Sequence, residues 1–206
     1  MTDIELVLPQ QFADQVFPDP ALLTYYRNLE NRTIWLEGDV SPSVAEISKN
    51  ILLWNADDND IKVPIESRIP IKLFIFTSGG DFDSMMQLVD VIEASETPVY
   101  TIASGAALSA GFDILISGHK RFALKSTSAL IHAGSMSMEG SFADSKQAFA
   151  HYEGKFERCK RYIVEKTHIS KEQLEQHWEK DWWCTAQELL DMGCIDRIVE
   201  KISEVL

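Results

Sequence analysis

Short apolar runs alternate with stretches of helical periodicity between residues 33 and 199. The run Ile71–Thr77 and the run at 99–103 are almost wholly apolar, as is typical of strands buried on both faces of a parallel sheet. Shorter runs predict further strands at 33–36, 121–124, 129–132 and 195–199. Repeated β-α-β order predicts a single α/β domain with a predominantly parallel sheet, covering helices and right-handed crossovers.

Helices are predicted between these strands from apolar spacing and from capping residues. Met85, Leu88, Val89 and Ile92 recur at helical spacing, and a longer amphipathic pattern covers 142–166. Ser41 followed by Pro42 predicts a helix start, with the end of that helix near 55–58. Further helices are predicted at 109–117, before Gly118, and from the capping box Thr185 to Glu188 as far as Gly193.

The whole chain, 1–206, is predicted to be one domain with two irregular parts. Pro9, Pro18 and Pro20 predict an irregular N-terminal arm over 1–30, with a short helix around 21–28. The polar stretch 57–70, which contains Pro64 and Pro70, predicts a surface loop or a small hairpin.

Charge and cysteine content restrict the possible partners. The formal net charge of −13 disfavours nucleic acid and anionic membranes as partners, and is typical of an acidic surface that keeps a protein in solution. The three cysteines are odd in number and form no CxxC pair, so neither a disulfide framework nor a zinc site is expected. With no signal peptide and no apolar run of membrane-spanning length, the expected location is the cytoplasm.

Ser109 is the candidate nucleophile. It opens a predicted helix and has the small residues Ala107 and Gly111 two positions away on each side, as an exposed hydroxyl on a tight turn requires. The alternative is an ordinary N-cap serine whose hydroxyl satisfies a free helix N–H. Spacing alone favours the N-cap.

His132, Asp181 and a glycine pair are the other candidates. His132 ends an apolar strand and could point into a cleft as a base, or simply lie exposed at the strand terminus. Asp181 precedes Trp182 and Trp183, which could shield it, although a loop acid or a helix cap is the alternative. Gly79 and Gly80 offer backbone N–H groups suited to an oxyanion hole, or form only a tight turn.

Four motifs together resemble the Clp protease proteolytic subunit. Residues 105–111, GAALSAG, are similar to the family's nucleophile motif G-x-A-A-S-M-G, and LIH at 130–132 is similar to its M-I-H. EKD at 179–181, followed by TAQE and GCID, resembles its E-R-D…S-A-x-E-A…G-L-[VI]-D. TSGG at 77–80 corresponds to its S-P-G-G. The similarity covers roughly residues 33–202.

Several positions depart from the family's pattern. Ser78 replaces a proline, Ala110 a methionine and Lys180 an arginine. After His132 the family has Q-P and a glycine pair, a stretch that serves substrate pairing and ring-to-ring contact there, whereas this chain continues AGSMS. The loop 57–70 is also longer than usual, and residues 1–24 lack the family's axial-loop pattern.

The resemblance implies a serine endopeptidase on a fold shared with the crotonases. Ser109 would attack the peptide carbonyl, His132 would be the base, Asp181 would orient it, and Gly79 or Gly80 with Ala110 would bind the oxyanion, with no metal or organic cofactor. It also implies a heptameric ring, single or stacked in two, in which the long helix makes oligomer contacts. No G-x-x-x-x-G-K-[ST] motif occurs, so a separate ATP-dependent AAA+ unfoldase is the expected partner.

Three alternatives remain beside this interpretation. A crotonase-type acyl-CoA enzyme would stabilise an oxyanion in the same way. It would not require Ser109, His132 and Asp181 at these positions. A catalytically silent subunit of a mixed ring is disfavoured because all three triad residue types are present. A phage-type peptidase of capsid maturation is a subtype that the motifs do not separate.

Overall fold

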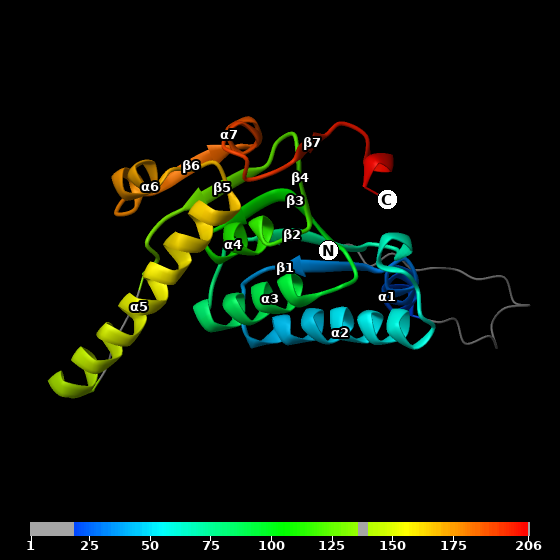
Figure 1. The fold of residues 1–206 in the computed structure, drawn as a ribbon, viewed down its shortest axis with the longest axis horizontal. Coiled ribbons are helices and arrows are strands. Elements are labelled where there is room, and N and C mark those ends of the chain that lie inside the picture. Colours follow the sequence, from blue (N-terminus) through cyan, green and yellow to red (C-terminus); the bar gives the residue numbers. More distant parts are fainter. Residues whose placement is uncertain (1–18, 136–139, 206) are drawn as a thin grey trace, which may run out of the picture. The chain divides into compact units, whose positions relative to one another are not determined.

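The computed structural model describes residues 19–135 and 140–205, and the chain divides into two compact units, Met1–Asn31 and Arg32–Leu206 (Figure 1). In the first unit, helix α1 (Pro20–Glu30) begins at Asp19, whose carboxylate accepts a hydrogen bond from the N–H of Ala21. The short helix predicted at 21–28 is therefore present and slightly longer than expected. The rest of the predicted irregular arm, 1–18, lies outside the described residues.

The second unit contains all the strands of the described chain, which form a seven-stranded sheet. The strands are β1 (Thr33–Glu37), β2 (Ile71–Thr77), β3 (Val99–Leu108), β4 (Lys120–Leu124), β5 (Ser128–Ile131), β6 (Trp182–Thr185) and β7 (Arg197–Val199). The helices are α2 (Ala45–Asp60), α3 (Phe82–Ala94), α4 (Ala110–Ile116), α5 (Phe142–Lys166), α6 (Lys171–His177) and α7 (Ala186–Asp191). Short 3₁₀ turns lie at Pro42–Val44, Ile65–Ser67 and Ile202–Glu204.

The sheet is mainly parallel and forks at its centre. Strands β1, β2, β3, β4 and β7 lie side by side in that order with parallel pairing. The first half of β3 pairs with β4, and its last three residues pair with β5 instead. Strand β5 pairs in turn with β6, the one antiparallel pair among the strands of the described residues. The predicted α/β class with predominantly parallel pairing is confirmed.

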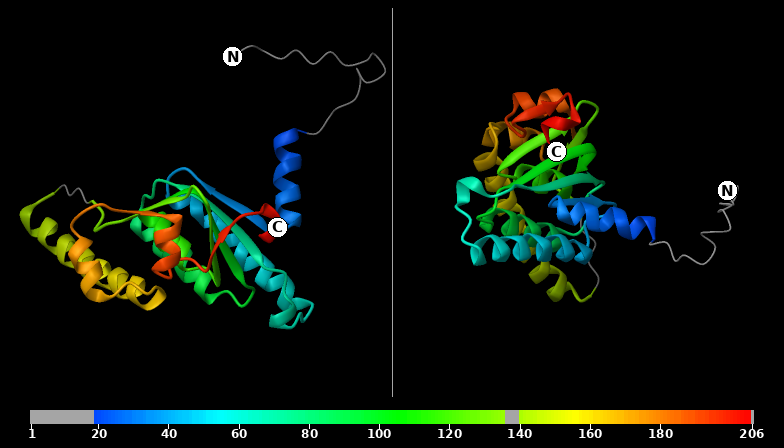
Figure 2. Two further views of the ribbon diagram at one scale, coloured as in Figure 1. Left: turned by 90° about the horizontal axis from the view of Figure 1, so that it is seen from above. Right: turned by 90° about the vertical axis from the view of Figure 1, so that its right-hand side faces the viewer.

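Most of the core lies between the sheet and helices α2, α3 and α4, which cover the same face (Figure 2). The apolar residues of α3 that the spacing singled out, Met85, Leu88, Val89 and Ile92, are all buried. A second, smaller cluster on the other side joins Phe74, Ile102 and Phe122 to the C-terminal residues Val199 and Val205. Both faces of the central strands are thus apolar, which explains their nearly continuous hydrophobic sequence.

Helix α5 has the bounds that its apolar spacing predicted, and it extends away from the sheet (Figure 1). Only Cys159 and Ile163, in its C-terminal half, are fully buried. In the N-terminal half Phe142 and Phe149 are exposed to solvent. The helix therefore contributes to the core of the described chain through one end only.

Several predicted boundaries were wrong. Helix α2 continues to Asp60 instead of ending near 55–58, and the stretch 57–70 is not simply a surface loop, because Asp58 and Arg68 are buried. Strand β3 runs five residues beyond 103, and neither α6 nor β6 was predicted. No helix among the described residues is both long and apolar enough to cross a membrane.

Candidate active site

Ser109 lies between the end of β3 and the start of α4, in a backbone conformation that non-glycine residues rarely adopt. Its φ is 53° and its ψ is −123°. Such a conformation stores strain of about 1–3 kcal/mol and persists only where the surroundings impose it. The N–H of Ser109 donates to the carbonyl of Leu130 on β5, and its own carbonyl accepts from the N–H of Phe112 on α4. The turn is therefore held from both the strand and the helix side.

The hydroxyl of Ser109 does not cap helix α4. Ser109 occupies the N-cap position, but its side chain makes no capping hydrogen bond. Instead its Oγ lies 2.8 Å from Nε2 of His132, which is within hydrogen-bond distance. The alternative of an ordinary N-cap serine is therefore wrong.

Strand pairing explains why His132 meets Ser109. In the parallel pair of β3 and β5, Leu108 lies opposite Leu130, so the residues just beyond these two strands emerge at the same edge of the sheet. The same carboxyl edge is where sites form in open α/β sheets. His132 is the first residue after β5, and its side chain is partly buried there.

Asp181 reaches the same edge from the antiparallel strand β6. Ile131 pairs with Trp182, so His132 and Asp181 are the next residues in register beyond that pair. The N–H of Ala133 also donates to the carbonyl of Trp178, which ties the two segments together. Oδ1 of Asp181 lies 3.6 Å from Nδ1 of His132, a distance for an ion pair but longer than a hydrogen bond. The carboxylate is 61% exposed, so any shielding by the tryptophans is limited to one side.

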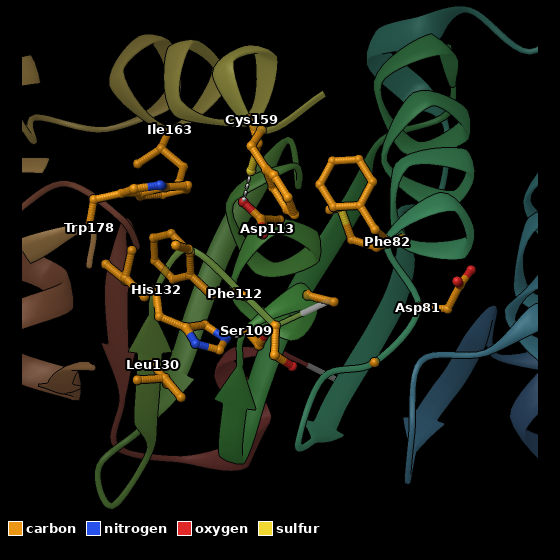
Figure 3. Close-up of a pocket in the computed structure, with 18 of the residues that line it drawn as sticks. Asp81, Phe82, Ser109, Phe112, Asp113, Leu130, His132, Cys159, Ile163 and Trp178 are labelled. Atoms are coloured by element: carbon orange, nitrogen blue, oxygen red, sulfur yellow. Dashed lines mark hydrogen bonds between the residues drawn. The ribbon is translucent and has the colours of Figure 1, made fainter. Parts of the chain in front are cut away.

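Ser109 and His132 lie at one end of a pocket of about 470 Å³ between α3, α4, α5 and β5 (Figure 3). Apolar and polar groups share its walls: the apolar side chains include Phe82, Met85, Phe112, Phe156, Ile163 and Trp178, and the polar ones include Asp81, Asp113 and His132. This size and lining are those of a site for an apolar or amphipathic side chain of a ligand. Within the described ranges, no cluster of histidine, cysteine and acidic residues could hold a metal ion.

Gly79 and Gly80 line the approach to Ser109 in different ways. The N–H of Gly79 donates to Oγ1 of Thr77 at 3.0 Å, so that group is already engaged. Val40 bonds to Gly79 and Asp81, the two neighbours of Gly80, and this parallel bridge turns the N–H of Gly80 away from Val40. Among the described residues no hydrogen bond engages the N–H of Gly80 or that of Ala110, the first residue of α4.

Comparison with known proteins gives the context for this geometry. Residues 20–202 match the Clp protease family. The chain belongs to the Clp protease family. It is 32% identical over 185 residues to the ATP-dependent Clp protease proteolytic subunit of Streptococcus sanguinis, covering 86% of this chain and 89% of that protein. It is 29% identical over 184 residues to the proteolytic subunit 2 of Treponema pallidum, covering 88% of each chain. The corresponding subunit 2 of Tropheryma whipplei is 31% identical over 176 residues, covering 84% of this chain and 93% of that one.

The resemblance drawn from the motifs is thereby confirmed, and the structure explains one departure from the Clp protease pattern. Ser78 stands where the family has proline, and its hydroxyl donates to Oδ1 of Asp39, just after β1, at 2.8 Å. A hydrogen bond to a neighbouring loop therefore restrains the turn that proline would otherwise stiffen. The departures at 136–137 lie outside the described residues.

Sequence reasoning missed two groups of residues in this Clp protease pocket. The amphipathic pattern over 142–166 predicted helix α5, but not that its residues Tyr152, Phe156, Cys159 and Ile163 line the pocket beside Ser109. Asp113 was not singled out, although it is the only charged residue in the otherwise apolar helix α4. A lone acid in a buried helix was the signal that could have found it.

Proposed function

We propose that this member of the Clp protease family hydrolyses peptide bonds with Ser109 as nucleophile, His132 as general base and Asp181 as the residue that orients the base. The observation that carries the proposal is the 2.8 Å contact of Ser109 Oγ with His132 Nε2 on a strained turn. The competing capping role is absent, so the hydroxyl is free to transfer its proton to the imidazole. Family membership supports the same chemistry.

In this mechanism Ser109 attacks the carbonyl carbon of the substrate while His132 accepts the hydroxyl proton. His132 then protonates the leaving amine, and water hydrolyses the acyl-enzyme with the same base. Asp181 favours the imidazole tautomer that carries its proton on Nδ1. The present separation of 3.6 Å is compatible with that role, because catalytic hydrogen bonds are often long without substrate and tighten when it binds.

The oxyanion would be held by the N–H groups of Gly80 and Ala110. Both groups flank Ser109 and have no other partner within the described ranges, whereas the N–H of Gly79 is engaged by Thr77. Gly79 would instead shape the approach to the nucleophile. Donors that are already in place cost no reorganisation when charge develops on the oxygen.

We further propose that the chain works as a ring with a separate ATP-dependent unfoldase. The named relatives are ATP-dependent Clp protease proteolytic subunits. This chain itself has no G-x-x-x-x-G-K-[ST] motif for ATP. A ring would also keep the open pocket beside Ser109 away from folded proteins.

The test is hydrolysis of short fluorogenic peptides by the wild type, Ser109→Ala and Asp181→Asn. Ser109→Ala is expected to lose essentially all turnover, by a factor on the order of 10⁴ or more. Asp181→Asn is expected to lose up to about 10⁴-fold, because the amide stabilises the wrong imidazole tautomer. Circular dichroism checks that both variants remain folded. Wild-type rates in a folded Ser109→Ala variant would rule out the proposed nucleophile.

A further inference from the structure

Asp113 is a buried carboxyl group in the wall of the pocket that holds Ser109. It lies on α4, one helical turn after Ser109, and is only 8% exposed. Figure 3 shows it between Ser109 and Cys159 of α5, joined to Cys159 by a hydrogen bond. Phe82, Phe112 and Phe156 are among the apolar side chains that line the same pocket. A carboxyl group in such surroundings loses hydration that only a partner can replace.

The partners of Asp113 within the described chain are weak. Oδ1 accepts a hydrogen bond from the thiol of Cys159 at 3.3 Å, and a thiol is a poor donor. No lysine, arginine or histidine among residues 19–135 and 140–205 forms an ion pair with it. Burial raises the pKa of Asp113 to about 7, and the hydrogen bond from Cys159 offsets only part of this shift. The pocket thus holds an acidic group without a cation.

We propose that Asp113 determines substrate specificity by pairing with a lysine or arginine side chain on the residue before the scissile bond. This rests on the proposed function, because it places that residue in the pocket while Ser109 attacks its carbonyl. One helical turn is about 5.4 Å, and an extended lysine side chain is longer than that. Its apolar stem would pack against the aromatic wall while the ammonium group reached the carboxylate.

The other ionisable groups around Asp113 do not supply the missing positive charge. They are Tyr152, Cys159 and Tyr162 on α5, Glu93 on α3 beside Tyr162, Asp81 at the N-cap of α3, and His132 after β5. Burial raises the pKa of the Cys159 thiol and of the Tyr162 hydroxyl, so both stay neutral. Hydrogen bonds from Ser84 lower the pKa of Asp81, so it stays anionic. His132 is the one basic side chain among these groups, and its Nε2 is engaged with Oγ of Ser109.

The raised pKa of Asp113 determines how the preference for a lysine side chain changes with pH. Below about pH 7 the free carboxyl group is largely protonated and tolerates an apolar side chain. Above that pH it is ionised and favours a cation. Preference for lysine over an uncharged side chain of similar length should therefore increase as the pH rises through about 7. Both peptides are cleaved by the same catalytic groups, so the pH dependence of catalysis itself cancels from their ratio.

The experiment compares two fluorogenic peptides that differ only in lysine or norleucine before the scissile bond. The ratio of their kcat/KM values is measured from pH 5.5 to 8.5. At the alkaline end the wild type is expected to favour lysine by roughly 10- to 100-fold, the usual range for a hydrogen bond to a charged group. Asp113→Asn should bring this ratio near one at every pH. Asp83→Asn, which removes an acid of α3 outside the pocket lining, should leave the ratio and its pH dependence in place.

Each outcome decides the proposal. A wild-type ratio near or below one at alkaline pH, with the norleucine peptide cleaved, overturns the role of Asp113 and leaves the proposed peptidase intact. Absence of cleavage of both peptides at every pH overturns both. If Asp113→Asn does not fold, the pH dependence of the wild-type ratio decides alone, since a ratio that does not change through pH 7 contradicts a titrating carboxyl group in the pocket.

Discussion

Gly79 lies so close to Ser109 that the glycine position cannot tolerate an added Cβ. A Cβ built on Gly79 would lie 2.7 Å from Cβ of Ser109 and 2.8 Å from the carbonyl oxygen of Leu108. The φ of Gly79 is also positive, at 100°. Glycine is required here for both reasons, because a side chain would push against the backbone that holds the strained serine.

Gly79→Ala should therefore reduce peptide hydrolysis by a factor on the order of 100 or more, because even small displacements of the nucleophile are costly. It should also lower the free energy of unfolding by about 1–3 kcal/mol. Gly154→Ala is the matched control. A Cβ at Gly154, in the middle of α5, would meet nothing within 4 Å, so this substitution should raise stability by about 1 kcal/mol. Equal effects of the two substitutions on activity would contradict the close-packing argument.

At the level of residues, the sequence predicted which side chains meet in the site, but not their exposure or their hydrogen-bond partners. Motifs placed Ser109, His132 and Asp181 together, and the structure brings all three to one edge of the sheet. The exposure of Asp181 and the engaged N–H of Gly79 could not be predicted, because both depend on groups brought together by folding. Asp113 was overlooked because a motif search considers only the positions that a family shares.

Helices and strands whose own residues show a clear apolar spacing were predicted well. Apolar spacing alone gave the bounds of α5, and the four buried positions of α3 follow their helical period. Strand β6 was missed because its four residues are strand only through pairing with β5, more than fifty residues earlier. That pairing is what brings Asp181 to His132, so the missed element is the one that positions the third site residue.

The end of α2 also depends on contacts with residues far away in the sequence, and these contacts contribute to stability. Asp58 accepts hydrogen bonds from both terminal nitrogens of Arg32, at 2.7 and 2.6 Å, and one from the hydroxyl of Thr97. These contacts join α2 to the starts of β1 and β3. Because the partners lie 26 and 39 residues away, the sequence showed only a polar stretch.

Asp58→Asn should lower the free energy of unfolding at neutral pH by about 3 kcal/mol, since it leaves Arg32 without its counter-charge. The Arg32 guanidinium holds the pKa of Asp58 below its usual value. The ionised carboxylate therefore stabilises the fold above about pH 4, and this contribution is lost as the pH falls through the lowered pKa. Urea unfolding at several pH values should show the wild type and variant converging in acid. The exposed neighbour variant Asp57→Asn should change stability little, and a gap that widens in acid would contradict the assignment.

For the molecule as a whole, exposed apolar side chains support an assembly. Phe142 and Phe149 on α5, and Trp35 and Phe76 on the sheet, are large and largely exposed. Such surface is often covered by a partner. The proposed ring of identical subunits would provide that cover through closed symmetry.

Light scattering of the purified protein should give a mass about seven or fourteen times that of the 23.3 kDa subunit. Short peptides should be cleaved without ATP, whereas a stably folded protein should resist unless an unfoldase is added. Ser109→Ala should keep the same mass, because the substitution lies in the pocket and removes one small polar group. A monomer at micromolar concentration that hydrolyses peptides at full rate would contradict the ring.

The most direct test of the central claim is covalent labelling with a fluorophosphonate, followed by mapping of the modified residue. Such a probe reacts with a serine whose hydroxyl is activated by a neighbouring base. The wild type should be labelled once, at Ser109, and Ser109→Ala should not be labelled. His132→Ala should react far more slowly, because the base 2.8 Å from the hydroxyl is then missing. Labelling at another serine, or no labelling of the folded wild-type protein, would contradict the account.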